Sequence, residues 1–225
     1  MSAASARAPG PFRLLVFDWD GTLADSERRI VATARAAIAA LGLPPRSDEA
    51  IRHVVGLGLA EAFQALYPDL SAEACARAVA GYRQRWVHTA GTPVPLFPGA
   101  LDALHELGRS GFLLAVATGK SRRGLARDLE SHGLAELFAE TRSADDAPSK
   151  PHPQMLLDIM SVLDVGAAET LMIGDTAYDL EMARNAGVAC AAVSCGMHAA
   201  DALLEYSPLA VLESVAGLPP WLARI

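Results

Sequence analysis

Leu14-Leu15-Val16-Phe17-Asp18-Trp19-Asp20-Gly21-Thr22-Leu23 is an apolar run that leads into two carboxylates. The apolar half predicts a buried strand, and Asp18 and Asp20 follow where that strand must end. An ionised carboxylate that leaves water without a partner loses a large solvation energy. The two aspartates therefore indicate a bound cation or a chemical reaction at the end of the strand.

Similar apolar runs recur along the chain. Buried strands are predicted at Arg13–Phe17, Phe112–Ala117, Thr170–Ile173 and Val188–Val193, with a weaker candidate at Leu137–Glu140. Helices are predicted between the later strands, at Ser121–His132, Pro153–Leu163 and Thr176–Ala186. Strands that alternate with helices predict a parallel sheet, and right-handed crossovers make it doubly wound. The expected fold class is therefore α/β, with a Rossmann-like core.

The segment between the first two strands is far longer than the dozen residues that one crossover helix needs. It carries three amphipathic stripes, at Ile30–Leu41, Leu59–Leu66 and Ala78–Trp86, and a return linker rich in proline and glycine at Gly91–Gly99. We therefore expect residues 23–96 to form an inserted all-helical cap domain. Residues 1–22 and 97–225 form the core in this prediction, including a helix near Ala100–Leu107.

The net charge, the length of the apolar runs and the cysteines exclude several kinds of partner and location. A net charge of -7 offers no basic surface to a nucleic acid. No apolar run approaches the ~20 residues that cross a bilayer, and Met1–Pro11 lacks the apolar centre of a signal peptide. Cys75, Cys190 and Cys195 are odd in number and widely spread, which favours reduced thiols. We therefore expect a cytoplasmic protein with no membrane or nucleic-acid partner. Whether it is a monomer or a homodimer stays open.

Four polar residues directly follow predicted strands: Asp18, Asp20, Thr118 and Asp175. In open α/β sheets the binding crevice lies beyond the carboxyl ends of the strands, so the fold brings these residues to one edge. Carboxylates that face one another repel unless a cation lies between them, and Mg²⁺ prefers such oxygen ligands. The sequence therefore predicts a magnesium site at this edge.

Each of these four residues could instead have a purely structural role. The Asp18–Asp20 pair could belong to a polar turn, and Asp175 could simply cap the helix that follows. Thr118, taken alone, is more often a helix cap than a catalytic group. A Ca²⁺ loop that opens with Asp-x-Asp is excluded, because the glycine comes at its fourth position and Arg29 at its twelfth.

Lysine is scarce in this chain. Of 19 basic residues only Lys120 and Lys150 are not arginine, which suggests sites that need a compact ammonium. Lys150 lies in a loop, Pro148-Ser149-Lys150-Pro151-His152-Pro153, where its structural alternative is a solvated surface lysine. Lys120 follows Thr118 and Gly119 at a predicted helix start, whose exposed amides suit phosphate oxygens. Contact between Lys120 and a substrate stays open.

Together these segments resemble the four ordered motifs of the haloacid dehalogenase superfamily. The motifs are Asp18-Trp19-Asp20-Gly21-Thr22, Thr118 after a strand, Lys150 before Pro-His-Pro, and Gly174-Asp175-Thr176-Ala177-Tyr178-Asp179. The resemblance covers nearly the whole chain, and the helical insertion is similar to the family's C1-type cap. The segments around Thr118 and Lys150 look most like the phosphoglycolate phosphatase branch. The resemblance implies a Mg²⁺-dependent phosphoric monoester hydrolase of small phosphorylated metabolites, with phosphoglycolate the leading substrate.

The resemblance also implies roles in the reaction. Asp18 would attack the phosphorus and become phosphorylated. Asp20 would protonate the leaving alcohol and then activate water. Thr118, Gly119 and Lys150 would bind the phosphoryl oxygens. Lys150 would also offset the charge on Asp18.

A metal site is implied in the same way. Mg²⁺ would be held by the side chain of Asp18, the backbone carbonyl of Asp20 and the carboxylate of Asp175. Asp179 would lie outside the set of direct metal ligands and orient Lys150. Substrate choice would belong to the cap, where residues 52–58 are plausible contacts, and cap hinges are expected near Leu23–Asp25 and Pro93–Pro98.

Other functions share this core. A sugar-phosphate phosphomutase or a pyrophosphatase would use the same residues and differ in the cap. A dehalogenase is disfavoured by Asp20, because a departing halide needs no acid. A non-catalytic binding protein is opposed by the complete catalytic set.

Overall fold

The computed structural model describes residues 10–88 and 93–225. Its centre is one parallel sheet with the strand order β3-β2-β1-β4-β5-β6. The strands are β1 (Leu14–Phe17), β2 (Leu113–Ala117), β3 (Glu140–Arg142), β4 (Thr170–Gly174), β5 (Ala189–Val193) and β6 (Val211–Leu212). The order reverses at β1, where the chain runs first to β2 and later to β4 on the other side. The doubly wound α/β fold predicted from the sequence is therefore confirmed.

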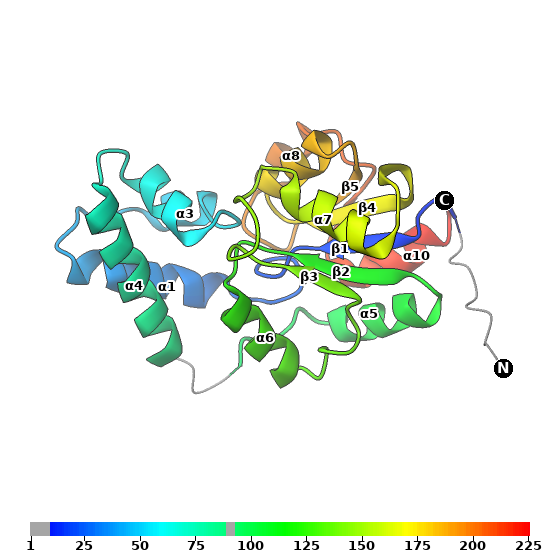
Figure 1. The fold of residues 1–225 in the computed structure, drawn as a ribbon, viewed down its shortest axis with the longest axis horizontal. Helices are drawn as coiled ribbons and strands as arrows, with labels where there is room; N and C mark the ends of the chain where they lie inside the picture. Colours follow the sequence, from blue (N-terminus) through cyan, green and yellow to red (C-terminus); the bar gives the residue numbers. More distant parts are fainter. Residues whose placement is uncertain (1–9, 89–92) are drawn as a thin grey trace.

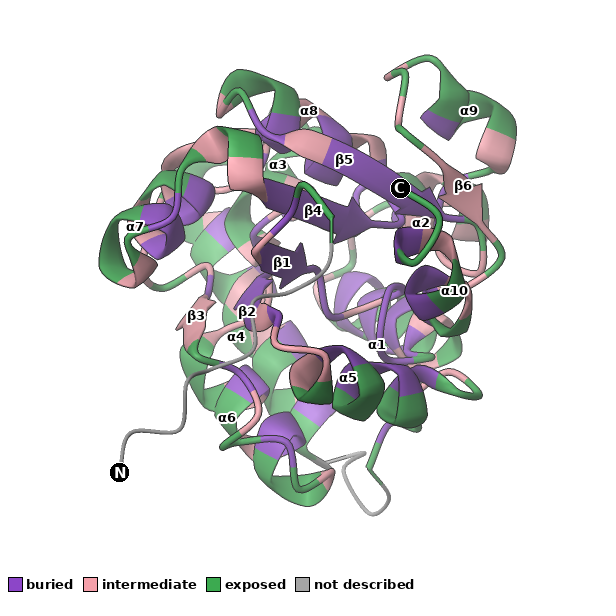
Figure 2. Ribbon diagram, turned by 90° about the vertical axis from the view of Figure 1, so that its right-hand side faces the viewer, coloured by how far each residue is buried: buried purple, intermediate pink, exposed green. Residues whose placement is uncertain are grey.

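Helices cover both faces of this sheet (Figure 1). One face packs against α7 (Gln154–Leu163) and α8 (Ala177–Asn185), and the other against α5 (Ala100–Arg109), α6 (Arg122–Ser131) and α10 (Leu218–Leu222). Because side chains alternate along a strand, Leu14 and Val16 join the first cluster and Leu15 and Phe17 the second. The central strands are buried on both sides, as their colouring in Figure 2 shows.

One strand prediction was wrong in position. The weaker candidate at Leu137–Glu140 is found at Glu140–Arg142, paired with β2. The apolar residue Phe138 does not pair in the sheet but packs edge-on against Phe17, with ring centroids 6.5 Å apart. An apolar run therefore marked core packing before the strand and not the strand itself.

The last part of the chain holds elements that the sequence did not predict. They are β6, α9 (Ala200–Leu204) and α10, with short 3-10 turns η1 (Ala167–Glu169) and η2 (Val215–Gly217). All are five residues or shorter, so they span too little sequence for a hydrophobic period to be visible.

Among the described residues, four helices lie between β1 and the segment of residues 93–97, which leads back to α5 and the sheet. They are α1 (Glu27–Ala40), α2 (Asp48–His53), α3 (Leu59–Leu66) and α4 (Ala72–His88). In Figure 1, α1, α3 and α4 lie beside the carboxyl end of the sheet. Their apolar stripes pack together, with Ile38, Phe63 and Trp86 among the buried residues.

The two connections between this helical segment and the sheet run side by side. The amide of Asp25 donates to the carbonyl of Pro95 at 2.8 Å, and the amide of Phe97 donates to the carbonyl of Leu23 at 2.9 Å. The predicted return linker Gly91–Gly99 falls partly on residues 89–92, outside the described residues. The predicted domain boundaries and hinges stay predictions.

Two compositional predictions can be compared with the structure. Cys75, Cys190 and Cys195 are all free thiols, and burial raises the pKa of each. Among the described helices, none is both long enough and apolar enough to cross a membrane.

Candidate active site

Asp18 lies at the carboxyl end of β1, inside the protein. Its amide donates to the carbonyl of Ile173 on β4 at 2.9 Å, which extends the strand pairing as far as the carboxylate. The Lys150 ammonium lies 2.8 Å from Asp18 Oδ1 and 2.6 Å from Asp179 Oδ1. Lys150 is only 1% exposed, so its interpretation as a solvated loop lysine is wrong.

Burial and the neighbouring opposite charges act in opposite directions on the pKa values of this cluster. Burial raises the pKa of Asp18 to about 7, although the Lys150 ammonium acts in the opposite direction. Burial alone would lower the pKa of Lys150, but the Asp179 and Asp18 carboxylates outweigh it and raise that pKa. Lys150 is therefore a permanent cation, held between two carboxylates.

Asp175 follows β4 and is fully buried. The Thr22 hydroxyl donates to its Oδ1 at 2.7 Å and the Met197 amide donates to its Oδ2 at 2.8 Å. Burial raises the pKa of Asp175 well above its ordinary value, and the nearby Asp179 and Asp18 carboxylates add to the effect. Gly21 has φ +90° and a Cβ there would collide with the Asp175 carboxylate, so the position requires glycine.

Asp175 does not cap α8, so that alternative is wrong. The helix is capped by Thr176, whose amide and hydroxyl both donate to Asp179 Oδ2, at 3.0 and 2.7 Å. The other oxygen of Asp179 accepts from Lys150 at 2.6 Å. Asp179 thus fixes the start of α8 and the position of Lys150 together.

The three carboxylates suit a divalent cation. Asp18, Asp175 and Asp179 are all buried, and each offers an oxygen within 4.8 Å of the others. Neither oxygen of Asp18 makes a well-aligned hydrogen bond with the described residues. Hard carboxylate oxygens fit Mg²⁺, which removes their mutual repulsion. The carboxylate of Asp20 is not part of this cluster, so the predicted role of Asp20 as a metal ligand rests on its backbone carbonyl alone.

The carboxylate of Asp20 is held separately by a lysine. Lys120 Nζ donates to Asp20 Oδ1 at 3.1 Å and to Oδ2 at 3.0 Å, and lies 3.2 Å from Asp128 Oδ2. It also lies 4.7 Å from the centre of the Trp86 ring on α4. The sequence did not point to Asp128, because it lies mid-helix in α6 with no motif around it.

Thr118 and Gly119 follow β2 at the same edge. Thr118 is buried and its hydroxyl accepts from the Lys120 amide at 3.2 Å. Helix α6 is capped by Ser121, so the capping interpretation of Thr118 is wrong. A Cβ at Gly119 would lie 2.5 Å from the carbonyl oxygen of Leu57, which brings the loop before α3 against this strand end.

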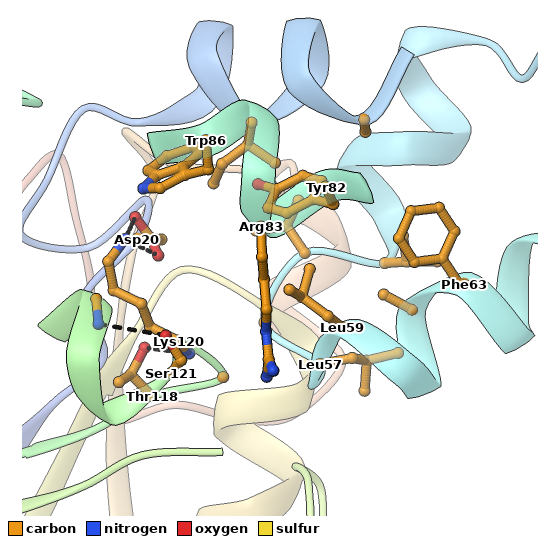
Figure 3. Close-up of a pocket in the computed structure, with 18 of the residues that line it drawn as sticks. Asp20, Leu57, Leu59, Phe63, Tyr82, Arg83, Trp86, Thr118, Lys120 and Ser121 are labelled. Atoms are coloured by element: carbon orange, nitrogen blue, oxygen red, sulfur yellow. Dashed lines mark hydrogen bonds and ion pairs between the residues drawn. The ribbon is translucent and has the colours of Figure 1, made fainter. Parts of the chain in front are cut away.

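A cavity of about 400 Å³ joins the strand ends to the helical segment. Asp18, Asp20 and Thr118 line one side of it, and residues of the four helices α1 to α4, of α6 and of the loop before α3 line much of the rest. Figure 3 shows Asp20, Thr118 and Lys120 gathered on one side, with Leu59 and Phe63 on the other. The carboxylates and the cavity together form a site that could take an anionic small molecule.

Known proteins share this sequence and architecture. A model of the haloacid dehalogenase-like hydrolase family matches residues 15–193. The chain is 38% identical over 205 residues to the probable phosphatase IndB of Dickeya dadantii, covering 89% of each chain. It is 31% identical over 215 residues to a phosphoglycolate phosphatase of Vibrio parahaemolyticus, covering 92% of this chain and 94% of that one.

A solved structure agrees in fold. The crystal structure of a hydrolase from Pseudomonas syringae superposes with a TM-score of 0.86 at 24% identity, covering 96% of this chain and 99% of that one. The matched family segment begins in β1 and ends with β5. The chain therefore belongs to the haloacid dehalogenase-like hydrolases.

Proposed function

We propose that this hydrolase is a Mg²⁺-dependent phosphatase of small phosphomonoesters, acting through a phosphorylated Asp18. The names of its relatives, a probable phosphatase and a phosphoglycolate phosphatase, support this class of reaction. Phosphoglycolate is the first compound to test. The observation that carries the proposal is the buried Asp18 carboxylate, paired with Lys150 at 2.8 Å and exposed to the cavity.

In the first step an Asp18 oxygen attacks phosphorus, and the bond from phosphorus to the ester oxygen breaks. Lys150 offsets the negative charge of Asp18 and of the incoming phosphoryl group, so the two anions can approach. The Thr118 hydroxyl and the Gly119 amide lie at the neighbouring strand end, where they can donate to phosphoryl oxygens. Phosphoryl transfer depends mainly on such positioning and on charge compensation.

In both steps a proton moves through Asp20. Its carboxyl group gives a proton to the departing alkoxide, and the resulting carboxylate then takes one from the water that attacks the phosphorylated Asp18. Lys120 fixes the Asp20 carboxylate by contacts to both oxygens. Asp18 is therefore the nucleophile and Asp20 the general acid and base, and a different lysine contacts each carboxylate.

The metal would be held by the carboxylates of Asp18 and Asp175 and the backbone carbonyl of Asp20. Bound Mg²⁺ supplies Lewis-acid stabilisation of the phosphoryl charge. Thr22 and the Met197 amide keep Asp175 oriented by donating to its two oxygens.

The experiment is phosphate release from a panel of phosphomonoesters, including phosphoglycolate, with Mg²⁺ and with EDTA. We expect turnover that requires the metal and falls at least about a thousandfold in Asp18→Asn, because the amide is not a nucleophile. The control is Asp164→Asn, an exposed residue in a left-handed turn that asparagine also tolerates. Turnover by Asp18→Asn at the rate of the unmodified protein would refute the mechanism.

A further inference from the structure

The cavity is large for the smallest phosphomonoesters. Its volume of about 400 Å³ lies in the range of pockets that enclose drug-sized ligands. One end meets Asp18, Asp20 and Thr118, where the phosphoryl group would lie. A two-carbon acid attached to that phosphoryl group would leave most of the remaining space unfilled. The alcohol part of the substrate therefore has room to be bulky.

Much of the wall away from Asp18 is apolar. Leu57, Leu59 and Phe63 form one side, at and before α3, and Figure 3 shows them apart from Asp20, Thr118 and Lys120. Across from them, Tyr82 and Trp86 of α4 stack with ring centroids 6.0 Å apart and an angle of 14° between the planes. A flat aromatic wall that faces aliphatic side chains favours a ligand with a flat, largely apolar group.

The Tyr82 hydroxyl is a polar group on the aromatic side of the cavity. Among the residues that the structure describes, none forms a hydrogen bond with the Tyr82 hydroxyl. Burial raises the pKa of Tyr82, so the hydroxyl stays a neutral donor at ordinary pH. A guest with a hydrogen-bond acceptor on its edge would satisfy this group.

Arg83, Arg123 and Arg127 line the cavity, and Arg83 and Arg127 already lie near aspartates. Arg83 lies 3.6 Å from Asp145 Oδ1, and Arg127 lies 3.7 Å from Asp128 Oδ1. A substrate carboxylate would have to compete with these aspartates for the same cations.

We propose that the natural substrate is the phosphomonoester of an alcohol that carries a flat, largely apolar ring with a polar edge. The phosphoryl group lies at Asp18, and the ring lies between Leu59 and the Tyr82–Trp86 stack. This proposal rests on the phosphatase function proposed above and specifies its substrate class.

The test compares two esters whose leaving alcohols are nearly equal in acidity, propyl phosphate and phenylpropyl phosphate, with phosphoglycolate beside them. We expect kcat/KM with Mg²⁺ to be about tenfold or more higher for the phenylpropyl ester, because the ring buries apolar area. Equal values for the two esters, or a clear preference for phosphoglycolate, would overturn the ring site and leave the phosphatase proposal standing. No release from any of the three would overturn both.

A lysine introduced into the apolar wall of the cavity gives a second test. Leu59→Lys should lower kcat/KM for the phenylpropyl ester at least about fivefold more than for the propyl ester. The matched control is Val162→Lys, which adds the same charge on an exposed position of α7, away from the cavity. Thermal melting checks that both variants fold. An unchanged ratio of the two kcat/KM values in Leu59→Lys would refute the placement of the ring.

Discussion

The Lys120 ammonium donates to both carboxylate oxygens of Asp20, at 3.1 and 3.0 Å, although the two residues lie 100 positions apart in the sequence. Both side chains are largely buried, at 8% and 15% exposed, so water screens their contact only weakly. Asp128 faces the same ammonium, and the Trp86 ring lies against it. Lys120 therefore links the proposed acid–base group to α6 and to α4.

This contact predicts a dependence on the leaving group. Lys120→Met frees the Asp20 carboxyl, so esters of ordinary alcohols, which need a proton on departure, should lose about 10–100-fold in kcat. Nitrophenyl phosphate, whose leaving group is weakly basic, should lose only a few-fold. Steady-state kinetics on both substrates measures the difference, with Arg77→Met on the exposed side of α4 as the control. Equal losses on the two substrates would show that Lys120 does not act through Asp20.

Thr22 gives a prediction about metal affinity. Its hydroxyl donates to Asp175 Oδ1 at 2.7 Å, and Thr22→Val keeps the shape while removing that bond. We expect the Mg²⁺ concentration for half-maximal activity to rise about tenfold, because an outer hydrogen bond orients the ligand. The matched control is Thr33→Val, another buried threonine, which donates to the Arg29 carbonyl in α1. A Mg²⁺ requirement that stays unchanged in Thr22→Val would contradict the role of Asp175.

The raised pKa values predict how metal and protons compete. The pKa of Asp18 is raised to about 7, so the folded protein binds more protons than the unfolded chain between about pH 4 and pH 7. This carboxyl therefore lowers the stability of the metal-free protein as pH rises through that window. Mg²⁺ should reverse the effect by binding the ionised form, so its stabilisation should be larger at pH 8 than at pH 6.

Thermal melting with Mg²⁺ or EDTA at the two pH values measures this competition. Asp18→Asn should reduce the pH dependence of the Mg²⁺ effect, since its amide does not titrate. A Mg²⁺ shift in melting temperature that is the same at pH 6 and pH 8 would rule the competition out.

Lys150 gives a prediction about stability. Its replacement by methionine leaves the buried carboxylates of Asp18 and Asp179 without their shared cation, at a cost of about 3–5 kcal/mol of unfolding free energy in EDTA. Arg13→Met breaks only a half-exposed contact with Glu169 at 4.0 Å and should cost less than about 1 kcal/mol. Urea unfolding compares the two, and equal losses would mean that the Lys150 cluster contributes no more than a surface ion pair.

Much of the fold could be predicted because its signals are local. The apolar run before Asp18 and the strand–helix alternation after Phe112 each lie within a few residues, and the structure has strands β1, β2, β4 and β5 there. Asp18, Thr118 and Asp175 could be placed at one edge because each directly follows a strand. The position and register of β3 could not be predicted, because an apolar residue such as Phe138 can either pair in a strand or pack in the core beside it.

The sequence by itself determined the alternation of elements and the positions of the motif residues, since hydrophobic period and residue type are local properties of the chain. The family resemblance already implied that Lys150 lies near Asp18 and Asp179, and the structure has these contacts. Only the tertiary structure decided that Lys120 lies between Asp20 and Asp128. These partners come from different strand ends and helices, and their contacts depend on how the sheet and helices pack, for which no local pattern carries a signal.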